Sequence, residues 1–323
     1  MKSGQAIATV LAVFGMILGP GLSRTSQVSF GQSRTISSGP DSSVGAHPVT
    51  IPVSINVKGI KPEPELQMID LVVSEDNEPQ TILSIRAIGN NSPLTFAVLI
   101  QDDLVSSIGN EIKPLGEFIR RLPKGSRVLV GYLRTGSLQV RQKFTSDLDK
   151  AAKALRVPVS SSSASPYNPY VEVIEAIKRF DSQPSGRRAI LLISDGLDTS
   201  HGIDSSSAGQ SIDLQRSITE SQRRSIAVYS FYAPSVGGQD RLLVGNAQGS
   251  LEKLSEETGG RAFFQGLGAP VSFDPFIKGL TSSLEKQVAL TYLSTHSEKG
   301  FHRIKVRSAT PGVEVDYPAG YTR

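Results

Sequence analysis

The segment most informative about the fold is LTFAVLIQDDLVSS, Leu94–Ser107, whose apolar run ends abruptly at Gln101-Asp102-Asp103. The mostly apolar residues Leu94–Ile100 predict a strand that is buried on both faces. In open α/β sheets, ligands bind at the edge where such strands end. Ile108–Leu122 follows with apolar residues at helical spacing and two arginines in its last turn, which predicts a helix.

The same order of strand and helix recurs through the middle of the chain. Arg188–Ser194 (RAILLIS) and Ser225–Tyr232 are further apolar strands, and Asp195-Gly196 ends the first of them. Pro169–Phe180 has helical spacing, whereas the glycines of Gly245–Gly249 indicate a loop before a helix at Ser250–Thr258. Alternating strands and helices predict an α/β fold over residues 91–287, with a doubly wound, mostly parallel sheet.

Strand patterns flank this region on both sides. Val49–Val57 alternates apolar and polar residues, and further strands are expected before residue 90 and after residue 288. We expect residues 47–90 and 288–323 to pack together as a small β unit, since neither segment is large enough to be stable alone.

The amino terminus has the pattern of an export signal. Residues 1–23 combine Lys2 with a short apolar core that Gly19-Pro20 interrupts. Residues 24–46 are rich in serine and glycine and predict a disordered tether. We therefore expect an exported protein, periplasmic, in the cell envelope or extracellular, with no integral membrane span after signal cleavage. Retention of the segment as an anchor is the alternative.

Composition excludes several classes of site. The 323-residue chain has a net charge of +4 and no cysteine, which rules out disulfides, thiolate metal sites and a thiol nucleophile. Its basic pairs form no stripe interleaved with aromatic residues, so no nucleic-acid partner is expected. The four histidines are far apart in sequence and show no zinc-ligand spacing.

Acidic residues follow both buried strands, at Asp102-Asp103 and at Asp195 and Asp198. Because parallel strands end at the same edge of a sheet, these carboxylates could converge on one site for Mg²⁺ or Ca²⁺. Alternatively, Asp102 and Asp195 cap the turns that follow them.

The chain resembles von Willebrand factor A (VWA) domains, and more closely the VWFA-related proteins of Acidobacteria. The resemblance covers about residues 48–323. The segments that carry it are TFAVLIQDDLVSSIGNEIKPLGEFIRRLP, RVLVGYLRTGSLQVRQKFTSDLDKAAKAL, SPYNPYVEVIEAIKRF, RRAILLISDGLDTS, LEKLSEETGGRAFF and FHRIKVRSATPGVEVDYPAGY. It implies a doubly wound sheet whose strand ends often hold a metal-ion-dependent adhesion site.

That site needs an Asp-x-Ser-x-Ser turn, a threonine in a middle loop and a later aspartate. Gln101-Asp102-Asp103-Leu104-Val105 stands at the first motif, and only Asp195 matches outright. Ser165 occupies the middle loop, where it could instead cap a helix. A register slipped by one residue would use Asp102 and Ser106. We interpret the site as degenerate, without a cofactor, and with Asp102, Asp103 and Asp195 as weak candidates for Mg²⁺ or Ca²⁺.

The sequence contains none of the common phosphate-loop, nucleophile-elbow or zinc-protease motifs. We therefore expect a non-enzymatic protein that binds an unknown protein or peptide at the carboxyl-terminal edge of its sheet. The alternatives are a metal-dependent adhesion module, a hydrolase that uses the acidic residues, and a structural envelope component. The candidate binding residues are Gln101, Asp102, Asp103, Ser106, Ser165, Tyr167, Asp195 and Asp198.

Overall fold

The structure, a computed structural model, describes residues 45–57, 70–89, 92–203, 206–238 and 240–323. Almost all of the predicted signal and tether, residues 1–46, lies outside these ranges. Residues 43–323 belong to one compact unit. No helix among the described residues is long and apolar enough to cross a membrane.

A six-stranded sheet occupies the middle of the chain in the order β6-β5-β4-β7-β8-β9. All its strand pairs are parallel except that of β5 with the edge strand β6. Every residue of the central strand β4 is buried, as its apolar sequence predicts. The strands are β4 (Leu94–Gln101), β5 (Arg127–Arg134), β6 (Ser137–Thr145), β7 (Arg187–Ser194), β8 (Ile226–Tyr232) and β9 (Ala262–Phe263).

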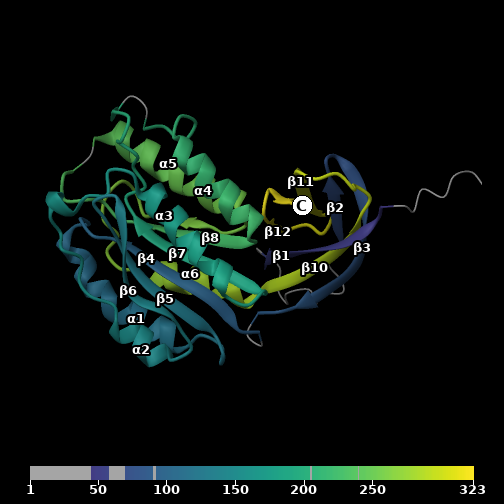
Figure 1. The fold of residues 1–323 in the computed structure, drawn as a ribbon, viewed down its shortest axis with the longest axis horizontal. Coiled ribbons are helices and arrows are strands. Elements are labelled where there is room, and N and C mark those ends of the chain that lie inside the picture. Colours follow the sequence, from purple (N-terminus) through teal and green to yellow (C-terminus); the bar gives the residue numbers. More distant parts are fainter. Residues whose placement is uncertain (1–44, 58–69, 90–91, 204–205, 239) are drawn as a thin grey trace, which may run out of the picture. The chain divides into compact units, whose positions relative to one another are not determined.

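Helices cover both faces of this sheet (Figure 1). Alternate residues of β4 enter two cores: Phe96 and Val98 face α1, α2 and α6, and Ala97 and Leu99 face α3, α4 and α5. The predicted α/β fold is thereby confirmed. The helices are α1 (Ile112–Arg120), α2 (Leu148–Lys153), α3 (Pro169–Lys178), α4 (Ile212–Arg223), α5 (Arg241–Glu257) and α6 (Asp274–Glu285).

The flanking strands pair as expected and form a seven-stranded sheet in the order β12-β1-β10-β3-β2-β11-β13. The prediction that this β unit is small was wrong, because the sheet has more strands than the six-stranded one. It is antiparallel throughout, and β1 and β10 pair with Val53 opposite Val288. Its alternate residues build a third core. The strands are β1 (His47–Val57), β2 (Leu71–Glu75), β3 (Glu78–Ala87), β10 (Gln287–Ser294), β11 (Phe301–Ser308), β12 (Val313–Asp316) and β13 (Gly320–Thr322).

Two helix predictions need correction. The α-helical part of the segment after β4 begins only at Ile112, after the 3₁₀ helix η2 (Ser106–Glu111), so that Pro114 falls in its first turn, where a missing N–H is tolerated. The predicted glycine loop is wrong, because Gly245 and Gly249 lie inside α5. A Cβ at either glycine would meet nothing within 4 Å, so these glycines cost helix propensity without affecting packing.

Arg187, the first residue of β7, connects the two sheets. Its guanidinium donates to the side-chain oxygen of Gln287 on β10, at 2.7 Å, and to the carbonyls of Gly89, Ser92 and Leu284 at 2.6–3.0 Å. Burial lowers the pKa of Arg187. Several charge-assisted hydrogen bonds are what such a buried cation needs.

Candidate functional site

The carboxyl-terminal ends of β4 and β7 lie side by side, with Ile100 opposite Ile193. Gln101, Asp102, Asp103 and Asp195 therefore occur at the same edge of the sheet. We call this edge the rim, made by residues 101–107, 154–168, 195–203, 233–238 and 264–273. Backbone hydrogen bonds connect its loops, for example from Ser160 N to Asp102 O.

The side chain of Gln101 makes three hydrogen bonds within the rim. Its Oε1 accepts hydrogen bonds from the Ser194 hydroxyl and from the Asp195 backbone N–H, while its Nε2 donates to Asp103 Oδ1 at 2.8 Å. The side chain is fully buried. A neutral amide thus bridges β4 and β7 where a carboxylate would be the expected metal ligand.

The carboxylate of Asp102 pairs with Arg156. The pair is bidentate, at 2.7 and 2.8 Å, and Asp102 also accepts from the Val159 backbone N–H. The guanidinium of Arg156 stacks over the Tyr132 ring, 3.9 Å from its centroid. A second arginine, Arg134, is more distant, with its Nη1 3.8 Å from Asp102 Oδ2.

Asp103 and Asp195 are two rim carboxylates that interact electrostatically. Burial, with a smaller contribution from the charge of Asp103, raises the pKa of Asp195 to about 6. Burial also raises the pKa of Asp103, although hydrogen bonds from Gln101 and Ser165 act in the opposite direction. Asp195 accepts from the Leu197 backbone N–H at 3.1 Å, which is the turn-capping role that the sequence left open.

The remaining candidates have local structural roles or stand apart. Ser165 does not cap α3, because Asn168 is the N-cap and donates its amide to Asp213. Asp198 accepts from the hydroxyls of Ser200 and Ser211, which fixes the loop to the start of α4.

Ser106 is exposed in η2, and Tyr167 is 59% exposed with a left-handed backbone, at φ 58°. Tyr167 is thus the most exposed aromatic side chain of the rim.

The rim does not fit the metal site that the resemblance implies. Gln101 carries no charge, Asp102 is engaged by Arg156, and Val105 has no side-chain oxygen. In the slipped register Asp102 would be the first ligand, and its carboxylate is held by the same ion pair. Within the described part of the chain, the one group of three or more possible ligands whose atoms lie within 4.8 Å of one another is in the seven-stranded sheet.

Exposed apolar side chains gather on the rim loops. Of fourteen large hydrophobic residues that are exposed among the described residues, eight come from these loops. Val157 and Val159 follow Arg156 in the chain, and Val236 follows β8. The eight are Val157, Val159, Tyr167, Ile203, Val236, Phe264, Leu267 and Val271.

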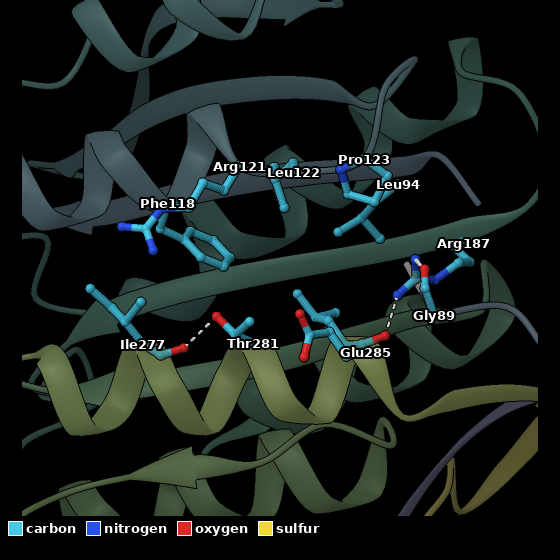
Figure 2. A pocket seen from close by; sticks show the side chains of 11 residues that line it. Gly89, Leu94, Phe118, Arg121, Leu122, Pro123, Arg187, Ile277, Thr281 and Glu285 are labelled. Carbon is cyan, nitrogen blue, oxygen red and sulfur yellow. Dashed lines mark hydrogen bonds between the residues drawn. The ribbon is translucent and has the colours of Figure 1, made fainter. Parts of the chain in front are cut away.

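A cavity of about 200 Å³ lies near the opposite edge of the sheet, between α1 and α6 (Figure 2). Phe118 and Ile277 line it from these helices, and Arg187 stands at one end. Because the Arg187 guanidinium already donates to backbone carbonyls, it is poorly placed to bind an anionic ligand. Sequence reasoning predicted no site here.

No family model matches the chain, and no curated protein matches it. Among solved structures, it is similar to the conserved hypothetical protein BatB from Bacteroides thetaiotaomicron (15% identity, 59% of this chain and 98% of that chain, TM-score 0.41). It is also similar to an aerotolerance-related membrane protein from Bacteroides fragilis (14%, 59% and 99%, 0.38). A von Willebrand factor type A protein from Catenulispora acidiphila is a third match (12%, 84% and 72%, 0.39). Similarities this distant do not indicate a function.

Proposed function

We propose that this chain is an exported, VWA-like interaction module that binds a protein or peptide at its rim, without catalysis and without a divalent cation. The observation that carries the proposal is the concentration of exposed apolar side chains on the rim loops. Apolar and aromatic groups on a hydrogen-bonded scaffold are typical of a recognition surface.

The polar interior of the rim supports independence from metal. The Asp102 charge is neutralised by Arg156, and Gln101 holds Asp103 and the backbone N–H of Asp195 in one network. These interactions are the basis for proposing that the loops keep their positions without a cation. The side chain of Tyr167, on its left-handed turn, is the contact that we expect a partner to bury.

Site-specific photo-crosslinking tests the proposal. A benzoylphenylalanine is placed at Val157 or Tyr167, with Leu83 on β3 as a control of similar exposure. We expect both rim positions to capture the same protein from the native cell envelope, with or without EDTA. With the purified partner, Tyr167→Ala should weaken binding at least about tenfold.

Each alternative function predicts a different experimental outcome. Capture that needs Mg²⁺ or Ca²⁺ would support a metal-dependent adhesion module. Hydrolysis of esters or phosphates that disappears in Asp195→Asn would support a hydrolase. Equal capture at Leu83 and at the rim would place the binding surface elsewhere.

A further inference from the structure

A second polar cluster lies in the seven-stranded sheet, far along the chain from the rim residues. The β2–β3 turn and the β10–β11 loop occur at the same end of neighbouring strands, because β10, β3, β2 and β11 are adjacent. Glu75 ends β2, Asp76 begins the turn, and His296 follows β10. His302 on β11 completes the cluster.

Ligand atoms of three of these residues lie close together. A carboxylate oxygen of Glu75, one of Asp76 and a ring nitrogen of His296 are all within 4.8 Å of one another. The Glu75 Oε1 to His296 Nδ1 distance is 3.8 Å. Ligands of a tetrahedral Zn²⁺ are about 3.3 Å apart for bonds of about 2.0 Å, so small side-chain movements would close the site.

Two buried atoms of the cluster lack partners. Glu75 is completely buried, and its Oε2 has no hydrogen-bond partner among the described residues. Likewise, Nδ1 of His296 is buried without a partner in that part of the chain, and it faces the Glu75 carboxylate. Leaving such groups unsatisfied is costly, and one cation between them would satisfy both.

His302 has a different role in the cluster. Its Nδ1 lies 2.8 Å from Asp76 Oδ2, and its Nε2 lies 3.0 Å from the carbonyl oxygen of Glu298. Both ring nitrogens thus face oxygen acceptors. His302 therefore orients the Asp76 carboxylate, as outer-shell partners of metal ligands commonly do, and is not itself a ligand.

We propose that Glu75, Asp76 and His296 form a binding site for a divalent transition-metal ion, with Zn²⁺ as the best match. Two carboxylates and one imidazole leave a fourth position for water, and the nitrogen ligand favours Zn²⁺ or Co²⁺ over Mg²⁺. Bound metal would tie the β2–β3 turn to the β10–β11 loop and stabilise this sheet. The spacing of the histidines along the sequence did not indicate this site, because His296 lies near Glu75 and Asp76 only through the pairing of β10, β3 and β2.

Titration of tag-free, metal-stripped protein with Co²⁺ tests the site through the visible absorption of the ion. We expect saturation at one ion per chain, competition by Zn²⁺ but not by millimolar Mg²⁺, and a higher Tm with Zn²⁺. His296→Ala, at a partly exposed position, should weaken Co²⁺ binding at least about tenfold. Glu75→Gln should do the same.

His201→Ala and Asp195→Asn are the controls, because one removes an exposed rim histidine and the other a rim carboxylate. Both should bind Co²⁺ like the unaltered protein. The proposal is wrong if no saturable signal develops below about 10 µM. It is equally wrong if folded His296→Ala, verified by circular dichroism, binds Co²⁺ with unchanged affinity.

Discussion

The carboxyl group of Glu172 makes the stability of this protein depend on pH. Glu172 lies on α3, is completely buried, and neither of its oxygens has a hydrogen-bond partner in the described residues. Burial raises its pKa to about 8, and the charges of Glu175 and Asp103 add to the shift. The nearby backbone N–H groups of Gly136 and Ser137 offset only part of it.

The sign of the effect follows from the two pKa values. The folded-state pKa, about 8, exceeds the usual 4.5 of the unfolded chain, so the folded state holds this proton more tightly. The contribution of Glu172 to the free energy of unfolding is greatest below about pH 4.5. It falls as pH rises and levels off above about pH 8. At 1.36 kcal/mol per pKa unit, the loss between pH 5 and pH 8 is about 3 kcal/mol.

Urea unfolding at pH 5, 6, 7 and 8 measures this loss for the unaltered chain and for Glu172→Gln, which cannot ionise. We expect the unaltered chain to lose about 3 kcal/mol more than Glu172→Gln over this range. Glu175→Gln is the matched control on the same helix, since Glu175 is partly exposed and pairs with Arg179. It should keep most of the pH dependence, losing only the part that the Glu175 charge adds to the shift of the Glu172 pKa.

Parallel stability curves for the unaltered chain and Glu172→Gln would refute this reasoning. They would mean that Glu172 is solvated or paired in the folded protein. A curve for Glu175→Gln as flat as that of Glu172→Gln would contradict the assignment equally, because it would move the titrating group to the helix surface.

The other predictions concern stability and use the same urea titrations at pH 7. Arg156→Met should cost at least about 3 kcal/mol, because it leaves the Asp102 carboxylate buried without its main partner, and adding Asp102→Asn should restore most of that loss. Arg187→Met should lower the free energy of unfolding by about 4 kcal/mol, since it leaves the carbonyls of Gly89 and Leu284 without their hydrogen-bond donor. Gly245→Ala should stabilise by about 0.5–1 kcal/mol in the open face of α5. Gly196→Ala should destabilise, because Gly196 has φ 72° and a Cβ would lie 2.8 Å from a carbonyl oxygen of α5. Any reversal of these signs would contradict the packing described here.

Much of the fold could be predicted because buried parallel strands leave a strong sequence signal. Leu94–Ile100 and Arg188–Ser194 are apolar throughout, and the alternation of strands with helices follows from them. The start of α5 was missed because Gly245 and Gly249 resemble loop residues. Its Asp240 cap, which accepts from Leu243 N, was the available signal.

The polar sites were harder to predict because their partners are distant in sequence. Asp102 and Arg156 are 54 positions apart, and no local pattern connects them. The cluster of Glu75, Asp76 and His296 depends on the pairing of strands from both ends of the chain. Spacing along the sequence could therefore not show it, whereas the replacement of a ligand by Gln101 was visible through the family resemblance alone.

Calorimetric titration of Mg²⁺ and Ca²⁺ tests most directly whether the rim is held together without a cation. The protein carries His296→Ala, so that the cluster in the other sheet does not contribute heat. We predict no binding by this protein up to millimolar concentrations, and binding in a variant that restores the metal motif through Gln101→Asp, Asp103→Ser and Val105→Ser. A dissociation constant below about 100 µM without these three changes, lost in Asp195→Asn, would contradict the account.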